Sequence, residues 1–222
     1  MKNSWMSLLI GLVIVALLAM PMPASAQGGN TYSSGFQVQN LESGMAADID
    51  LVFYTSAGAV AATISDTIAA NSNKTYFPLS AVSSGFAGSV LVVSKNGARV
   101  SAIVNMVIYD GTSIRGGGSY SGFTAGSTSV SLPLLMKANY GIGTWFSVQN
   151  TSATSQTIAI YYTGGGLTAS QCDTTVDVAP YSAKTIDQTV NTCLPNGWVG
   201  GAKLSGPYEL AAVVIQVKSG AK

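Results

Sequence analysis

Apolar and polar residues alternate along much of the chain, with the period of two that is typical of half-buried β-strands. Ile49, Leu51 and Phe53, for example, alternate with Asp48 and Asp50, so the carboxylates fall on the opposite face from the apolar side chains. No segment after residue 26 shows a sustained helical period with capping residues. The pattern therefore predicts an all-β fold.

The expected strands are short and are separated by turn signals such as Ser56-Ala57-Gly58 and Lys95-Asn96-Gly97, the second of which is typical of a hairpin. Six or seven strands per about 100 residues favour an immunoglobulin-like β-sandwich, although the Cys…Trp…Cys spacing of antibody domains is absent. The expected strands are 36–40, 48–53, 60–64, 74–79, 88–94, 99–109, 129–137, 145–150, 157–163, 174–178, 183–186, 200–204 and 210–218.

The second half of the chain repeats the first at a spacing of 110 residues. We therefore expect two tandem β-sandwich domains, over residues 27–110 and 129–222. Residues 111–128 are dominated by Gly and Ser and are expected to be a connector, although Tyr120 and Phe123 are unusual in a flexible linker. The identical pairs are Phe36/Phe146, Val38/Val148, Gln39/Gln149, Asn40/Asn150, Ala69/Ala179, Ser72/Ser182, Lys74/Lys184, Thr75/Thr185, Ala102/Ala212 and Val104/Val214.

Residues 1–26 have the features of a signal peptide and are not expected to belong to the fold. Lys2 precedes an apolar run from Leu8 to Met20, and Ala24-Ser25-Ala26 gives the small-x-small pattern of a signal peptidase site. The run is short for a membrane span, which needs ~20 residues; the alternative is an uncleaved anchor. We expect cleavage after residue 26, a secreted or cell-surface protein, and no membrane partner after cleavage.

Charge is sparse, with ten basic and nine acidic residues in the full chain, and loss of Lys2 with the signal peptide leaves nine of each. The sequence shows no basic patch of the kind that a nucleic-acid partner requires, so we expect no such partner. A neutral surface rich in Ser, Thr, Asn and Gly offers little electrostatic defence against self-association. Self-association is therefore either a liability of this protein or its purpose.

Both cysteines, Cys172 and Cys193, lie in the second half. An exported protein with two cysteines is expected to join them as a disulfide. The alternatives are two free thiols or a metal site, but two cysteines in a chain without histidine make a poor zinc set. We expect no cofactor and no metal.

The sequence offers no set of catalytic residues. Because the chain has no histidine, Ser-His-Asp and Cys-His machinery are excluded. Asp48 and Asp50 would suit weak Ca²⁺ binding, the alternative being a solvated strand face. Ser182 and Lys184 recur in the first half, and residues shared by both copies are expected to be structural. We expect the protein not to be an enzyme.

Exposed aromatic residues would suit a carbohydrate ligand or adhesion to a cell surface. Trp145 and Trp198 match positions in the first copy, which favours core packing, whereas Tyr140, Tyr161 and Tyr162 are less constrained. A monomeric extracellular binding module is therefore the second functional hypothesis.

The two copies have unequal ends. The strand at 129–137 has no counterpart before the first copy, and residues 119–123 have no counterpart after the second. The segment that contains Thr31, Tyr32, Gly35 and Phe36 is a near copy of residues 119–123.

This asymmetry leads to an assembly hypothesis. We expect the N-terminal strand of one subunit to add to the C-terminal domain of the next, along an acceptor edge formed by Val213, Ile215 and Val217. Such a head-to-tail contact makes a homopolymeric filament if it does not close. The alternative is that residues 32–36 only begin the first strand of their own domain.

Several motifs together resemble those of secreted bacterial tandem-repeat proteins. The resemblance covers nearly the whole mature chain, and it implies β-sandwich repeats on a cell surface, without an assigned activity and without catalytic residues. Our first functional hypothesis is accordingly a secreted structural protein that assembles into a filament or surface layer. The motifs are Phe-x-Val-Gln-Asn at 36–40, Lys-Thr-Tyr-Phe-Pro at 74–78, Ser-Gly-Phe-x-Gly-Ser at 84–89, Ala-Ile-Val-Asn at 102–105 and Leu-Pro-Leu-Leu-Met at 132–136.

Overall fold

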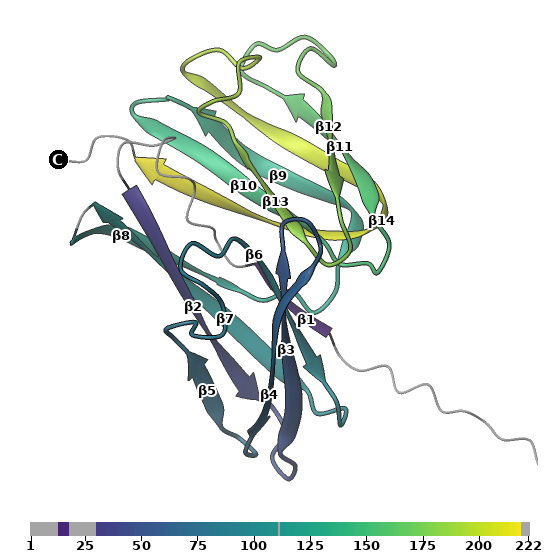
Figure 1. The fold of residues 1–222 in the computed structure, drawn as a ribbon. Helices are drawn as coiled ribbons and strands as arrows, with labels where there is room; N and C mark the ends of the chain where they lie inside the picture. The colour runs from purple at the N-terminus through teal and green to yellow at the C-terminus, as the bar shows by residue number, and fades with distance from the viewer. Residues whose placement is uncertain (1–12, 18–29, 111, 219–222) are drawn as a thin grey trace, which may run out of the picture.

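The computed structural model describes residues 13–17, 30–110 and 112–218, and every regular element among them is a β-strand (Figure 1). All strand pairs are antiparallel. The predicted all-β fold is confirmed. The strands are β1 (Val13–Leu17), β2 (Asn30–Asn40), β3 (Ala47–Thr55), β4 (Val60–Ile68), β5 (Asn73–Tyr76), β6 (Gly88–Ser94), β7 (Val100–Asp110), β8 (Ser113–Ser121), β9 (Ser127–Lys137), β10 (Ile142–Asn150), β11 (Gln156–Thr163), β12 (Thr174–Val178), β13 (Ala183–Asp187) and β14 (Trp198–Lys218).

The first half of the chain forms two four-stranded sheets, in the orders β1-β6-β3-β4 and β5-β2-β7-β8. Their facing sides enclose one hydrophobic cluster that includes Phe36, Leu51, Phe53 and Val92, all at most 1 % exposed. The strict alternation of buried and half-buried residues along β3 confirms the pattern seen in the sequence around residue 50.

The second half forms one six-stranded sheet that curls around its own hydrophobic cluster, which includes Phe146, Ile160 and Trp198. Strand β14 holds this sheet together, because its beginning pairs with β11 and β9 and its end pairs with β10. The sequence predicted two strands here; the structure joins them into one strand of 21 residues, with a register shift between Ser205 and Leu210.

The last residue of the Phe-x-Val-Gln-Asn motif explains part of the 110-residue repeat. Asn40 and Asn150 are fully buried, and each side-chain amide lies 2.7–3.2 Å from three backbone carbonyl oxygens. Each side-chain oxygen also accepts a backbone N–H two residues later. Buried carbonyl groups need such partners, so this asparagine is a structural residue in both halves. The carbonyl partners are Met45, Ile68 and Ala69 for Asn40, and Thr154, Val178 and Ala179 for Asn150.

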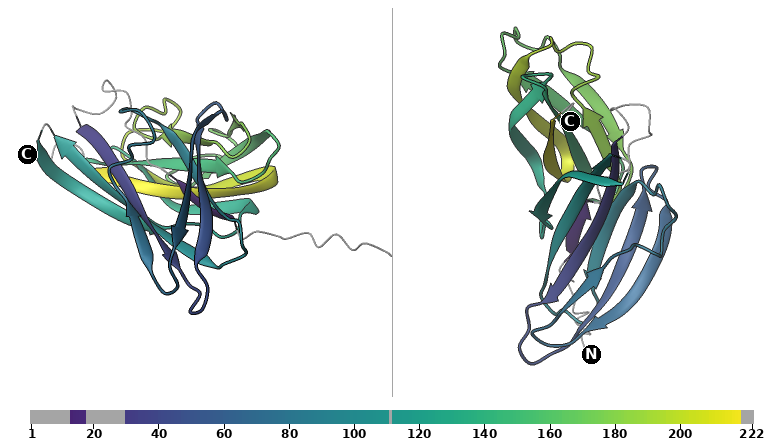
Figure 2. Two further views of the ribbon diagram at one scale, coloured as in Figure 1. Left: turned by 60° about the horizontal axis from the view of Figure 1, so that its bottom comes forward. Right: turned by 90° about the vertical axis from the view of Figure 1, so that its left-hand side faces the viewer.

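The two halves lie end to end and contact one another (Figure 2). A small cluster at the junction contains Tyr32 and Met106 from the first half and Trp145 and Val217 from the second. The rings of Tyr32 and Trp145 meet edge to face, with centroids 6.2 Å apart. On the other side of the junction, the hydroxyl of Ser89 donates a hydrogen bond to the carbonyl oxygen of Tyr181, at 2.6 Å.

Two local predictions are wrong. Lys95-Asn96-Gly97 is a turn with a positive φ at Gly97, but it joins β6 to β7 in the opposite sheet and so is not a hairpin. Part of the expected connector, residues 113–121, is the edge strand β8, which pairs with β7. Strand β8 forms despite its glycines because Tyr120 packs against the core of the first half and anchors it.

The predicted signal peptide falls largely outside the described residues, at 1–12 and 18–26. Its residues 13–17 form β1, which pairs with β6 over five positions. This part of the segment therefore joins a sheet, contrary to the expectation that residues 1–26 lie outside the fold. A run of apolar residues suits the edge of an apolar strand such as β6.

Candidate functional site: the free sheet edge at the junction

The predicted donor residues lie in a strand that pairs within their own half. Thr31, Tyr32, Gly35 and Phe36 are part of β2, which pairs with β7 over eleven positions. Phe36 is 1 % exposed in the core of the first half. Within the single chain, the segment therefore pairs inside its own half, as expected from the alternative hypothesis that residues 32–36 only begin their own domain.

The predicted acceptor residues lie in the last part of β14. From residue 210 to 218 this strand pairs with β10 on one side. On its other side β9 reaches only Leu210. Within the described chain, no strand therefore pairs with the second edge of β14 over residues 211–218.

The equivalent edge in the first half is covered. Residues 103–110 of β7 pair with β8, and Ile103, which precedes Val213 by one repeat, lies opposite Ser121. The two halves thus share the same inner strands but differ in what covers this edge. An uncovered edge leaves backbone N–H and C=O groups available to another strand.

The free edge borders a groove of about 420 Å³ between the two halves. One wall contains Val214, Ile215 and Gln216 of β14, and the other contains Met106 and Ile108 of β7, with further lining from Gly117, Gly118, Ser119, Pro133 and Leu134. The lining is mainly apolar or glycine, so an added strand would bury apolar surface there.

The side chains of the acceptor edge already have contacts inside the chain. Val217 is buried and Ile215 half-buried against Tyr32 and Met106 at the junction, and Val213 is half-buried. The edge therefore offers mainly its backbone to a partner. The predicted donor and acceptor segments meet in one molecule through Tyr32 and Val217, but they do not pair as strands.

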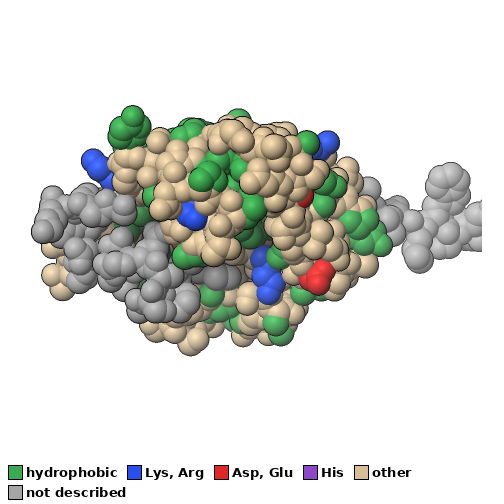
Figure 3. Space-filling view, turned by 90° about the horizontal axis from the view of Figure 1, so that it is seen from above, with side chains coloured by type: hydrophobic (Ala, Val, Ile, Leu, Met, Phe, Trp, Pro, Cys, Tyr) green, Lys and Arg blue, Asp and Glu red, His purple; other side chains and the backbone are tan. Residues whose placement is uncertain are grey.

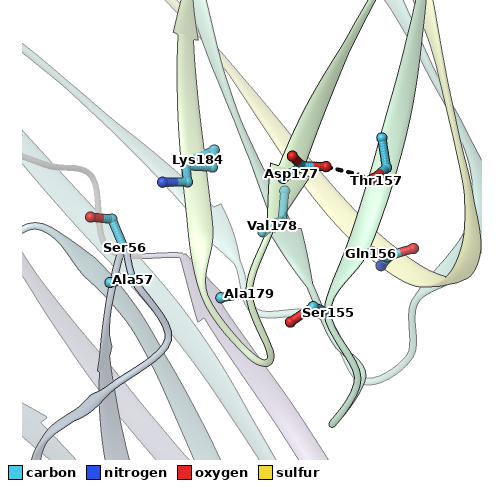
Figure 4. Close-up of a pocket in the computed structure, with 9 residues that line it drawn as sticks. All are labelled: Ser56, Ala57, Ser155, Gln156, Thr157, Asp177, Val178, Ala179 and Lys184. Atoms are coloured by element: carbon cyan, nitrogen blue, oxygen red, sulfur yellow. Dashed lines mark hydrogen bonds between the residues drawn. The ribbon is translucent and has the colours of Figure 1, made fainter.

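A second hollow, of about 320 Å³, lies where the β3–β4 turn meets the second half (Figure 4). Ser56 and Ala57 of the turn face Lys184 and Ala179, and Asp177 accepts a hydrogen bond from Thr157. A side chain at Gly58 would place its Cβ 2.6 Å from the Cβ of Ala179, and the φ of Gly58 is +84°, so glycine suits both the turn and the contact. The residues that line this hollow include one cation, Lys184, and one anion, Asp177, and no aromatic ring.

The aromatic candidates for a sugar site are dispersed. Trp145, Trp198 and Tyr162 are at most 3 % exposed, which confirms core packing of the tryptophans. Tyr161 is 43 % exposed on the opposite face of β11 from Tyr162, and Tyr140 is 92 % exposed at the tip of the β9–β10 turn. These side chains do not line a common groove in the described structure.

The weak catalytic and metal candidates have structural roles. Asp48 and Asp50 accept hydrogen bonds from Thr67 and Ser65 of the neighbouring strand, and Asp50 also pairs with Lys95 at 3.0 Å. The hydroxyl of Ser182 donates to the carbonyl oxygen of Ala179. No group of three or more Cys, Asp or Glu residues suited to a metal ion occurs among the described residues.

The disulfide between Cys172 and Cys193 is present, with a Cα–Cα distance of 5.7 Å. It links the loop between β11 and β12 to the loop between β13 and β14. This confirms the predicted pairing and excludes the free-thiol alternative.

Three carboxyl groups of the first half have a lowered pKa. The pKa of Glu42 is lowered by its hydrogen bonds from Arg99, and that of Asp50 by hydrogen bonds from Ser65 and Lys95. Burial raises the pKa of Asp66, but the hydrogen bonds from Lys74 and Tyr76 outweigh it and the net shift is downward. These groups hold the ion pairs Lys74–Asp66, Lys95–Asp50 and Arg99–Glu42.

The face of the molecule seen in Figure 3 carries few charged side chains, and these are isolated among hydrophobic and uncharged groups. No helix of the described residues has the length and hydrophobicity of a membrane span. Comparison with protein-family models, with curated proteins and with solved structures found no match.

Proposed function

We propose that the protein is a secreted structural subunit that assembles head to tail into an extracellular filament or surface layer. In this proposal the signal peptide is removed and each half is an immunoglobulin-like β-sandwich. The observation that carries the proposal is the second edge of β14 over residues 211–218, which no strand of the described chain covers and which lies beside a mainly apolar groove.

A free edge of this kind is well suited to strand addition. Its strand contributes no acidic residue from Leu210 to Lys218, and a single lysine at the end, so little charge repels a partner strand. Residues 32–36 resemble the end of β8, the strand that covers the equivalent edge of β7. The N-terminal strand of another subunit therefore has a suitable sequence for the free edge of β14.

Donation of this strand requires an exchange. In the single chain, Asn30 to Gly35 pair with residues 105–110 of β7, and those pairs must open before the strand reaches a neighbour. The gain is a strand that covers the β14 edge and fills the groove. Assembly by this route is expected to be slow and to increase with protein concentration.

The test compares two lysine substitutions at repeat-equivalent positions in the chain from Gln27. Val213→Lys places a charge beside the free edge and is expected to reduce the assembled mass in light scattering and to remove filaments in electron microscopy. Ile103→Lys changes the edge that β8 covers and is expected to leave assembly unchanged. Unassembled wild-type protein at high concentration would refute the proposal.

A second test addresses the donor. Deletion of residues 27–34 removes the proposed donor strand and is expected to reduce the assembled mass. If the mass is unchanged, the N-terminal strand is not the donor, whereas the Val213→Lys comparison still decides whether the β14 edge is used.

The alternative function is a monomeric module that binds carbohydrate or a cell surface. The observation that favours it is Tyr140, which is almost fully exposed and has a φ of +48°, a conformation that non-glycine residues rarely adopt. Tyr140→Ala would then abolish binding to cell-wall polysaccharide in a pull-down. The structural proposal expects no such binding in the wild-type protein.

A further inference from the structure

One edge of strand β6 is covered by β1, which is part of the predicted signal peptide. In the second half, the strand at the equivalent position is the beginning of β14, and β9 covers its edge from Trp198 to Ser205. In the first half, β1 takes the same place along β6, from Val93 to Ser89. The covering strand therefore belongs to the predicted signal peptide, and removal of that peptide exposes β6.

The exposed edge would be unusually apolar. Residues 90–93 of β6 are Val-Leu-Val-Val, and the whole strand contains neither a charged residue nor a proline. Charged residues and proline are the usual devices that keep an edge strand from pairing with another chain. Strand β6 lacks both devices.

Two β6 strands can also pair with one another over apolar residues. In a two-fold antiparallel pair centred on Leu91, Leu91 lies opposite Leu91 of the second copy, Val90 opposite Val92, and Ser89 opposite Val93. The three central positions then pair apolar residues with apolar residues, and the core-facing Val90 and Val92 of both copies lie on the same face of the joined sheet. Such cross-strand pairs stabilise an antiparallel ladder.

We propose that removal of the signal peptide exposes the β6 edge, which then pairs antiparallel with β6 of a second copy of the chain. Before cleavage, β1 covers the edge and prevents this pairing. The contact uses the same surface on both copies and so has two-fold symmetry. It deepens the proposed function and rests on it, because it adds a second interface between subunits, distinct from the β14 edge.

The test uses the chain from Gln27 in a Val213→Lys background, in which the β14 contact is weakened. This protein is expected to be a dimer by size-exclusion chromatography with light scattering. Adding Val93→Lys, at a half-buried position on the edge strand, is expected to give a monomer. The matched control is Val52→Lys on β3, which is half-buried and lies beside Leu91 on a strand paired on both sides; it is expected to leave the dimer intact.

A peptide provides an independent measurement that needs no folded variant. A synthetic peptide of residues 11–19 with terminal lysines is expected to compete for the β6 edge and shift the dimer toward monomer, whereas the same peptide with Val15→Pro is not. A monomer in the Val213→Lys background, or a dimer that persists with Val93→Lys, would overturn the inference. If Val213→Lys does not reduce higher assembly, the β14 proposal fails, and the effect of Val93→Lys on the assembled mass still decides the role of β6.

Discussion

The two halves of the molecule share their interior and differ at their edges. Asn40 and Asn150 make equivalent sets of hydrogen bonds, and even the positive φ angles of Asn71 and Tyr181 recur at the repeat spacing. By contrast, β8 covers one edge of β7, whereas among the described residues no strand pairs with the equivalent edge of β14 after Leu210. The repeat therefore identifies the residues that build each half, and the departures from it identify the surface where an assembly contact is to be sought.

The halves also differ in how they are stabilised. The ion pairs Lys74–Asp66, Lys95–Asp50 and Arg99–Glu42 lie in the first half, and the disulfide lies in the second. Both tryptophans of the described chain, Trp145 and Trp198, are also in the second half. In the chain from Gln27, tryptophan fluorescence therefore reports on the second half and, through Trp145, on its junction with the first. Hydrogen exchange followed by mass spectrometry can report on each half separately.

The largest expected effect comes from the shared asparagine. Asn40→Ala and Asn150→Ala each remove three side-chain hydrogen bonds to backbone carbonyl groups and one from a backbone N–H, and we expect each to lower the free energy of unfolding of its own half by on the order of 3 kcal/mol. Denaturant unfolding combined with hydrogen exchange would measure this. Equal losses of unfolding free energy in the two halves would support the equivalence of their interiors. A negligible loss in either half would contradict it.

The same geometry has a consequence for modification. Asn150 begins the glycosylation sequon Asn150-Thr151-Ser152, but its amide is fully buried and hydrogen-bonded in the folded protein. Asn73 begins another sequon and is exposed. In a host that glycosylates folded exported proteins, mass spectrometry is expected to find a glycan at Asn73 and none at Asn150.

Reduction of the disulfide is the next largest effect and is confined to one half. Cys172 and Cys193 close a loop with a sequence separation of 21, which in the chain-entropy model corresponds to about 3 kcal/mol. Cys172→Ala/Cys193→Ala, or reduction by dithiothreitol, is expected to lower the stability seen by tryptophan fluorescence while exchange in the first half stays unchanged. Destabilisation of both halves together would show that they unfold as one unit.

Acid is expected to act more weakly and on the other half. A carboxyl group whose pKa is lower in the folded state contributes stability above its unfolded pKa, and this is lost as the pH falls through the folded pKa. For Asp50 and Asp66 the loss is expected below about pH 4 and on the order of 1 kcal/mol each, because their pairs are partly exposed.

Hydrogen exchange at pH 3 and pH 6 would measure the effect of acid. Asp66→Asn is expected to make the stability of the first half less dependent on pH in this range. If acid accelerated exchange in the second half more than in the first, the assigned difference between the halves would be incorrect.

Much of the fold follows from local sequence patterns. Alternation predicted β3 and most of the other strands, and the repeat predicted two equivalent interiors. The sequence misjudged segments whose state depends on distant partners. Strand β8 has the composition of a linker, and it forms because it pairs with β7 and because Tyr120 packs against the core. Strand β14 continues through Gly206 and Pro207 because β11 pairs with its beginning and β10 with its end.

The candidate site was predicted only in part. The sequence identified the region of the acceptor edge, but Ile215 and Val217 pack against the first half of their own chain. The edge of β6 was missed, although the uncharged Val-Leu-Val-Val run was visible in the sequence. The alternation of apolar and polar residues identifies which residues are buried. Pairing between strands that are far apart in the sequence decides which strand edges are free.

The central claim, that the β14 edge is open for a partner, can be tested by closing it. Because Lys222 corresponds to Thr112 in the repeat, a copy of residues 113–123 fused after Lys222 would supply an equivalent of β8 in the same chain. The matched control is the same fusion with Ser119→Pro and Ser121→Pro in the added copy, which cannot pair fully. By light scattering of the chain from Gln27, we predict that the fusion prevents head-to-tail assembly and that the proline control does not; assembly of the unmodified fusion to the wild-type mass would contradict the account.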